Sequence, residues 1–160
     1  MTTLSHAVFL RSGTFFFTVR LKDPEDDLLV RRMDALRQSF RECRQMMPFA
    51  LGHCAVLPNR IHLIWTLPPG DVAYGKRWRM IKTGFAGRVR EELGQSASGI
   101  WQRRYWEQPV TGPVDLAQYE EVIRMAPVQD GLVKRPETWR FSSFARRPIY
   151  DQPWSVTLAG

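Results

Sequence analysis

The most constraining feature of this 160-residue chain is a pair of short apolar stretches separated by Pro58-Asn59. His53–Leu57 and Arg60–Leu67 are rich in strand-forming residues, and a connection of two residues joins neighbouring strands as an antiparallel hairpin. Because side chains alternate along a strand, Arg60, His62, Ile64 and Thr66 lie on one face, and Ile61, Leu63 and Trp65 lie on the other. The chain is therefore expected to contain an antiparallel sheet with a polar patch on one face.

A strand and a helix are predicted before this hairpin. Gly13–Leu21 is rich in Phe, Thr and Val, which favours an extended strand. Asp23-Pro24 predicts the start of a helix, with Asp as the cap and Pro at the first helical position. One apolar stripe follows at steps of four and three residues, at Leu29, Met33, Leu36, Phe40, Cys43 and Met47.

Further helices and an extended segment are predicted after the hairpin. Asp115–Met125 favours a short helix that is ended by Pro127, and Gly131–Val133 favours a return to an extended segment. The residues from Glu137 onward are expected to be mostly irregular. This order predicts an α+β fold, with an antiparallel sheet covered on one face by helices.

The segment Gly75–Leu93 predicts a longer helix that carries the most concentrated basic surface of the chain. Its apolar residues recur at helical spacing and form a buried side. The basic residues between them are candidates for binding a phosphate backbone, and a solvated helix face is the alternative reading. The candidate DNA-binding residues in this helix are Lys76, Arg77, Arg79 and Lys82.

A second candidate binding segment, Gly99–Val110, alternates aromatic and basic side chains. Bases stack on aromatic rings and phosphates pair with guanidinium groups, so this pattern suits single-stranded nucleic acid. Core packing is the competing use for two of the rings. The residues predicted to contact DNA are Arg103, Arg104, Tyr105 and Trp106, with Trp101 beside them.

Composition favours a single basic globular domain that spans residues 1–160, with its core at about 12–146. Apolar residues make up 44% of the chain, and 23 Lys and Arg residues against 16 Asp and Glu residues give a net charge of +7. A polyanionic partner is expected, and nucleic acid is favoured over a membrane because no long apolar stretch or signal-like start is present. Solubility alone is the other explanation of the charge. Cys43 and Cys54 lack a paired-ligand spacing, which predicts reduced core residues in a cytoplasmic protein.

Six segments in order resemble the REP-associated tyrosine transposases, single-tyrosine enzymes of the HUH endonuclease superfamily. The resemblance runs from about Ser12 to Arg146, nearly the whole chain. No single segment is specific, but their order is. The segments are "GTFFFTVRL", "LPNRIHLIWTLP", "RWRMIKTGF", "IWQRRYWEQ", "APVQDGLV" and "TWRFSSF".

The resemblance implies a ferredoxin-like antiparallel sheet with helices on one face, and binding of single-stranded DNA stem-loops at mobile or repetitive elements. It also implies DNA transposition that requires a divalent metal, Mg or Mn, held by a His-hydrophobic-His motif. In such enzymes a tyrosine on a helix attacks the scissile phosphate. A polar residue one turn after that tyrosine completes the metal site. Such proteins act as monomers or homodimers.

Three of these four chemical positions carry a residue of another type in this chain. The His-hydrophobic-His motif falls on Arg60-Ile61-His62, so only the second histidine is present. The tyrosine position is Val122, and the later polar position is Ala126. A guanidinium has no lone pair for a metal, valine has no nucleophilic atom and alanine cannot coordinate. Metal- and tyrosine-dependent cleavage is therefore expected to be lost.

Some substitutes for the missing groups are conceivable. Tyr119 lies one turn before Val122 and is a candidate nucleophile, although a tyrosine at the edge of the core is the simpler reading. A two-residue turn at Pro58-Asn59 would make His53 and His62 diagonal neighbours, a candidate metal pair, although two half-buried histidines are the simpler reading. Arg60 is itself a candidate phosphate ligand in place of the metal.

Three functions follow from these patterns. The first is a transposase-family protein that binds DNA hairpins without cutting them, with enzyme activity left undecided. The second is an active DNA-nicking transposase that uses Tyr119 and an irregular metal site. The third is a non-functional remnant or a scaffold without a nucleic-acid ligand.

Overall fold

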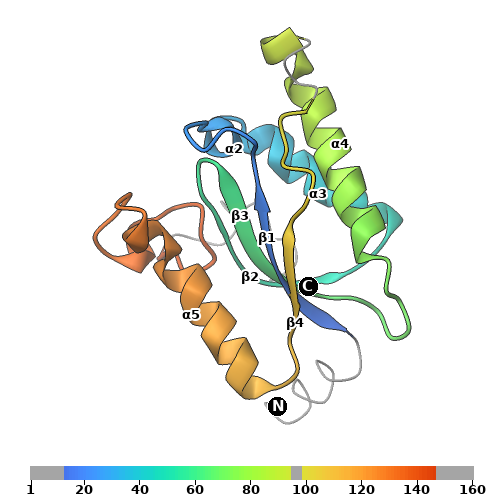
Figure 1. Ribbon diagram of the computed structural model, residues 1–160, viewed down its shortest axis with the longest axis vertical. Helices are drawn as coiled ribbons and strands as arrows, with labels where there is room; N and C mark the ends of the chain where they lie inside the picture. The colour runs from blue at the N-terminus through green and yellow to red at the C-terminus, as the bar shows by residue number, and fades with distance from the viewer. Residues whose placement is uncertain (1–12, 95–98, 147–160) are drawn as a thin grey trace.

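The structure is a computed structural model that describes residues 13–94 and 99–146. At its centre lies a four-stranded sheet in the order β2-β3-β1-β4 (Figure 1). Every neighbouring pair of strands is antiparallel, which confirms the predicted sheet and the α+β fold class. The strands are β1 (Thr14–Arg20), β2 (Ala50–Val56), β3 (Arg60–Thr66) and β4 (Trp106–Pro109).

The hairpin between β2 and β3 has the predicted two-residue turn. The Leu57 N–H donates to the Arg60 carbonyl oxygen across 2.8 Å, and Ala55 pairs with His62 as expected. The pairing then shifts between Leu51 and Cys54, which marks a bulge in β2. The bulge takes His53 out of the regular register, so the sequence alone could not place its side chain.

Two helices, α3 (Met33–Met46) and α4 (Tyr74–Leu93), pack on one face of the sheet, as predicted. The odd-numbered residues of β1 and β3 point into this layer, because the strand alternation puts them all on the same side. The resulting core contains Phe17, Val19, Leu36, Phe40, Leu63, Trp65, Trp78 and Ile81.

The helix α5 (Pro113–Gln129) packs on the opposite face, where the sequence reading expected no helix. Figure 1 shows α5 on the other side of the sheet from α3 and α4. A smaller apolar cluster joins it to the even-numbered residues of the sheet: Phe16, Ala55, Ile64, Val110 and Ile123. The same face carries His62 and Thr18, so α5 is the helix that positions the candidate site.

Several predicted boundaries were wrong. Asp23 forms a turn, with its carboxylate accepting from the Glu25 N–H, and the first helix, α2 (Leu28–Arg31), starts later. Pro127 does not end α5, which continues to Gln129. The helix lacks only the hydrogen bond that the missing N–H of Pro127 would have donated. Gly131–Val133 forms a turn instead of an extended segment, and the fourth strand is β4.

The irregular C-terminal segment lies against the outer edge of β2. The Val56 N–H donates to the Phe141 carbonyl oxygen, and the Ser143 N–H donates to the Cys54 carbonyl oxygen, each across 2.8 Å. Cys43 and Cys54 are buried and free, as predicted. Over the residues that the structure describes, no helix has both the length and the apolar character needed to cross a bilayer.

Candidate functional site

His62 lies at the centre of the polar patch, with both ring nitrogens engaged. Its side chain is buried, its Nδ1 is 2.7 Å from the Thr18 hydroxyl, and its Nε2 is 3.0 Å from Arg60 Nε. The guanidinium is always a donor, so Nε2 must be the acceptor and the ring proton is on Nδ1. The Nδ1–H therefore donates to Thr18, which pairs with His62 across β1 and β3.

The Arg60 guanidinium also forms a bidentate ion pair with Asp130, directly after α5. Its Nη1 and Nη2 donate to the two carboxylate oxygens across 2.6 and 2.8 Å. The Arg60 side chain is only 13% exposed, so little water competes for these bonds. Two parallel charge-assisted bonds fix the geometry strongly, which ties β3 to the end of α5.

The electrostatics agree with this network. Burial, together with the positive charges of Arg60 and Arg20, lowers the pKa of His62 to about 3, and Asp130 opposes the shift. The hydrogen bonds from Arg60 lower the pKa of Asp130 below its ordinary value. At neutral pH the site therefore consists of a neutral imidazole beside a compensated pair of opposite charges.

The residues present do not fit the divalent metal that the resemblance implies. The Nε2 lone pair of His62 is directed at a cation, and Arg60 has no lone pair to replace the missing histidine. Ala126 is buried and has no donor atom, while the Asp130 carboxylate already neutralises Arg60. Within the described ranges, no group of three or more His, Cys, Asp or Glu residues is arranged to hold a metal ion.

His53, the candidate partner of His62 in a metal pair, is engaged elsewhere. His53 Nδ1 is 2.8 Å from the Ser143 hydroxyl, and its ring stacks on Phe144 with centroids 4.0 Å apart. Its Nε2 lies 3.9 Å from a Glu120 carboxylate oxygen. Burial lowers the pKa of His53, and Glu120 opposes that shift. The bulge in β2 thus directs His53 toward the C-terminal segment.

Two positions on α5, Val122 and Tyr119, were considered for the nucleophile, and neither presents a free hydroxyl to His62. Val122, at the expected tyrosine position, is 47% exposed and has only methyl groups to present. Tyr119 stacks on Phe16, with ring centroids 4.6 Å apart and planes 8° apart. Phe16 in turn lies nearly parallel to the His62 ring at 6.0 Å. Tyr119 is therefore a core-edge side chain that packs on the apolar cluster beneath α5.

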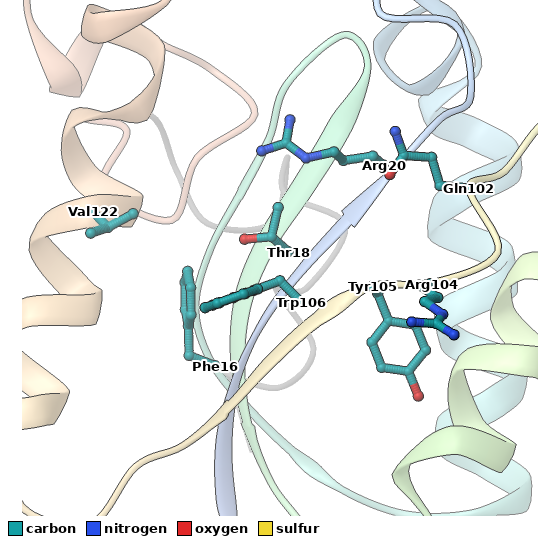
Figure 2. Close-up of a pocket in the computed structure, with 8 residues that line it drawn as sticks. All are labelled: Phe16, Thr18, Arg20, Gln102, Arg104, Tyr105, Trp106 and Val122. Carbon is teal, nitrogen blue, oxygen red and sulfur yellow. The ribbon is translucent and has the colours of Figure 1, made fainter.

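A cleft of about 580 Å³ lies over β1 and β4, and Thr18, the hydrogen-bond partner of His62, lines it. Figure 2 shows Phe16, Thr18 and Trp106 on the side that faces α5, with Val122 pointing toward them from the helix. Arg20 lies at the end of β1, next to Arg60 in the strand register. The lining residues are Phe16, Thr18, Arg20, Gln102, Arg104, Tyr105, Trp106 and Val122.

The fold brings the two basic candidate segments together. The Lys82 ammonium group donates to the Gln102 carbonyl oxygen across 3.0 Å, and the Trp101 indole N–H donates to the Lys82 carbonyl oxygen. Tyr105 packs on Phe17 and Trp78, and Trp101 is buried. Two aromatic residues of the segment Gly99–Val110 therefore belong to the core. The exposed candidates are Lys76 and Arg79 on α4, Arg103 and Arg104 in the segment before β4, and Trp106 at the start of β4, on the side that faces α5.

Arg77 lies away from this basic surface, contrary to the sequence reading. Its side chain is 1% exposed and forms two bonds with the Asp71 carboxylate, of 3.0 and 2.8 Å. It also donates to the Met47 and Pro48 carbonyl oxygens, and its hydrogen bonds lower the pKa of Asp71 to about 2. Arg77 therefore links α4 to the loop after α3 and has no free donor to offer to DNA.

Comparison with known proteins defines the family. A REP-associated tyrosine transposase of Escherichia coli strain K12 is 34% identical over 150 residues, which is 92% of this chain and 87% of the relative. The chain belongs to the REP-associated tyrosine transposases. A family relative in Haemophilus influenzae is 32% identical over 157 residues, covering 91% of this chain and 89% of the relative. No protein-family model matches the chain.

Two solved structures share this fold. A REP-associated tyrosine transposase bound to a REP hairpin has a TM-score of 0.76 and 36% identity, and the match covers 84% of this chain and 78% of that one. A transposase of Deinococcus radiodurans R1 has a TM-score of 0.51 at 19% identity, over 69% of this chain and 87% of its own. The second likeness supports the fold alone.

Sequence reasoning missed three residues of the site. Thr18 and Arg20 lie in a strand that was read only for its apolar content, and the register places them opposite His62 and Arg60. Asp130 lies beyond Pro127, where the sequence predicted the end of the helix. Its position next to Arg60 therefore could not be inferred from that helix. The available signal was its spacing, because Val122, Ala126 and Asp130 are four residues apart.

Proposed function

We propose that this protein binds a single-stranded DNA stem-loop and does not cleave it. A family relative with 36% identity is bound to a REP hairpin, and the sheet and helices of this chain superimpose on it with a TM-score of 0.76. Stem-loop DNA is therefore the ligand class for this chain. The protein acts as a monomer or a homodimer.

The proposal that the protein binds DNA rests on the contact between two basic segments, α4 and the segment before β4. The bond from Lys82 to the Gln102 carbonyl oxygen holds α4 against the segment before β4. Lys76, Arg79, Arg103 and Arg104 are exposed around this contact, and each can pair with a phosphate. Since such contacts release bound counterions from DNA, affinity should fall steeply with salt.

The loss of cleavage rests on the closed histidine site. Arg60 occupies the acceptor nitrogen of His62, and the helix position that should carry the nucleophile is Val122. No lone pair remains there for a metal and no oxygen remains there for attack. The Arg60–Asp130 pair is the structural replacement, because it joins β3 to α5 across the same position.

The test is a binding assay with labelled stem-loops, using linear strands and blunt duplexes of the same composition as controls. Measurements at 50 and 200 mM salt should give a preference for stem-loops and a loss of affinity of about 10²-fold or more, as expected for several phosphate contacts. Equal affinity for all three DNA forms, or an affinity independent of salt, would contradict the proposal. The bound stem-loop then becomes the substrate for a cleavage assay with Mg²⁺ or Mn²⁺, where no product is expected.

A further inference from the structure

A second concentration of positive charge lies in the C-terminal segment, residues 134–146. Four basic residues stand against one acidic residue there, so the segment carries a net charge of +3. All four basic residues are exposed: Lys134, Arg135, Arg140 and Arg146. None of them belongs to the surface formed by α4 and the segment before β4, which is called the stem-loop surface below.

The single carboxylate of the C-terminal segment leaves most of this charge uncompensated. One oxygen of Glu137, Oε1, lies 3.8 Å from Arg135 Nε and 3.6 Å from Arg146 Nη2, so two guanidinium groups share it at long range. Among the described residues, no carboxylate forms an ion pair with Lys134 or Arg140. Cations that the protein does not neutralise itself attract a polyanion to this surface.

Hydrogen bonds fix the C-terminal segment to the sheet, so its charges have defined positions. The Trp139 indole N–H donates to the Val56 carbonyl oxygen across 2.9 Å, beside the backbone bonds between the segment and β2. The Arg146 N–H donates to the Glu137 carbonyl oxygen across 3.1 Å and closes the segment on itself. A ligand that binds here therefore pays little entropy for ordering the backbone.

The aromatic rings of the C-terminal segment all have partners within the protein. Arg140 Cζ lies 5.0 Å over the Phe141 ring, which packs edge-on against Trp139 with centroids 5.5 Å apart. Phe144 stacks on His53. Binding of unpaired bases needs open aromatic faces, whereas the phosphate backbone of a duplex is bound by charge alone. The exposed groups of the segment therefore suit duplex DNA.

The C-terminal segment and the stem-loop surface lie on opposite sides of the sheet. The segment pairs with β2, and the stem-loop surface adjoins β4, which is the other edge strand in the order β2-β3-β1-β4. Figure 1 shows α4 on one side of the sheet, and α5 with the segment that follows it on the other. Two DNA molecules can therefore bind without sharing a surface.

We propose that the C-terminal segment binds the phosphate backbone of a second, double-stranded DNA while the stem-loop surface holds the stem-loop. The inference rests on the proposed function, because the stem-loop occupies the first surface. Contacts to phosphates alone give an affinity in the non-specific range, with Kd of roughly 10⁻⁴ to 10⁻⁶ M at physiological salt. The protein thus links a stem-loop to a neighbouring duplex of any sequence.

The experiment captures a biotinylated stem-loop on beads, loads it with the full chain and adds a fluorescent blunt duplex of about 20 base pairs at about 50 mM salt. Excess unlabelled stem-loop keeps the stem-loop surface occupied. We expect the beads to retain the duplex. The double variant Arg135→Gln/Arg140→Gln should lower the retained duplex by about tenfold or more, because two phosphate contacts are lost. Its affinity for the stem-loop should stay within about twofold of that of the natural protein.

Arg41→Gln/Arg90→Gln is the matched control, because it removes the same charge from exposed positions on α3 and α4. It should leave the retained duplex unchanged. Glu137→Gln removes the acidic side chain of the C-terminal segment and should raise the retained duplex, which a purely structural role of Glu137 would not do. Circular dichroism and thermal unfolding of each variant verify that the fold is intact.

The outcomes separate the inference from the proposed function. Retention that persists in Arg135→Gln/Arg140→Gln overturns the inference, as when a second copy of the chain holds the duplex. An equal loss of stem-loop affinity in this variant also overturns it, because the segment would then belong to the stem-loop surface. If no duplex is retained, the inference fails and the proposed function stands. Duplex binding by the protein alone that depends on Arg135 and Arg140, without a preference for stem-loops, overturns the hairpin function and supports the duplex surface. An absence of all DNA binding overturns both.

Discussion

The Nε–H of Arg60 donates to Nε2 of His62 across 3.0 Å, so a permanent cation is bonded to the ring nitrogen that would otherwise be free to bind a metal. The same guanidinium is held by Asp130, which fixes its position. The site is therefore closed by a specific hydrogen-bond network as well as by the lack of a second histidine.

Replacement of Arg60 should reopen the site to metal. In Arg60→His, two imidazoles two residues apart on β3 would face the Asp130 carboxylate, a donor set that suits divalent transition metals. We expect 1 mM Mn²⁺ to raise the melting temperature of this variant by a few degrees, because a ligand that binds only the folded state stabilises it. The natural protein should show no shift. A similar shift in both proteins would mean that the metal binds elsewhere.

The protonation of His62 makes the stability of the protein dependent on pH. Its pKa in the folded protein is about 3, below the ordinary value of 6.5. Between pH 3 and pH 6.5 the unfolded chain therefore binds more protons than the folded protein. This contribution is complete above about pH 6.5 and decreases as the pH falls toward 3, with a limiting slope of about 1.4 kcal/mol per pH unit. His62→Gln should therefore show a smaller loss of unfolding free energy between pH 7 and 5.

The histidine titration can be followed directly by NMR. The His62 ring should remain neutral at pH 5, and the half-exposed His53 provides an internal comparison because Glu120 opposes the effect of burial on its pKa. Protonation of His62 near pH 6.5 would contradict the acceptor role assigned to its Nε2. In Arg60→Met the pKa of His62 should rise, since one of the two positive charges that lower it is removed.

The Arg60–Asp130 pair should stabilise the packing of α5 on the sheet. Because Arg60 is 13% and Asp130 31% exposed, we expect a coupling free energy of about 1–2 kcal/mol in a double-mutant cycle with Arg60→Met and Asp130→Asn. Urea unfolding measures it. The exposed Arg124–Glu121 pair on α5 is the matched control and should show a much smaller coupling. Equal coupling free energies in the two pairs would show that burial does not strengthen the Arg60–Asp130 ion pair.

The parts of the fold that follow from local patterns were predictable, and the parts that depend on single side chains were not. The turn at Pro58-Asn59 fixed the pairing of Ala55 with His62, because a two-residue connection allows one register. The bulge near His53 carries no sequence signal of comparable strength. Arg77 lies four residues before the buried Ile81, so its position at the edge of the apolar stripe could have indicated burial.

The changed chemical positions of the site were predictable, and the contacts of the residues that occupy them were not. Arg60 and Val122 can be identified as non-catalytic types from the chemistry of their side chains alone. The partner of Arg60 could not, since Asp130 is 70 residues away in the sequence and follows a proline that predicts the end of a helix. Long-range pairs of this kind require knowledge of how α5 packs on the sheet.

Tyr119 should not substitute for the missing nucleophile. Its ring stacks on Phe16 within the cluster beneath α5, and movement toward His62 would break this contact. Incubation of a bound stem-loop with Mn²⁺ should therefore give no covalent protein–DNA adduct on a denaturing gel. An adduct that disappears in Tyr119→Phe would establish the nicking activity and contradict the proposed loss of cleavage.

Exposed and buried basic residues of α4 should differ in their effect on DNA binding. Lys76 and Arg79 are exposed beside the segment before β4, so Lys76→Ala and Arg79→Ala should each weaken stem-loop binding and reduce the slope of log affinity against log salt by about 1. Arg77→Met removes a side chain that is 1% exposed and leaves Asp71 unpaired, so it should lower the unfolding free energy. Its salt slope should equal that of the natural protein in a sample that remains folded. A reduced slope for Arg77→Met with an unchanged melting temperature would place Arg77 on the DNA surface, as its charge alone had suggested.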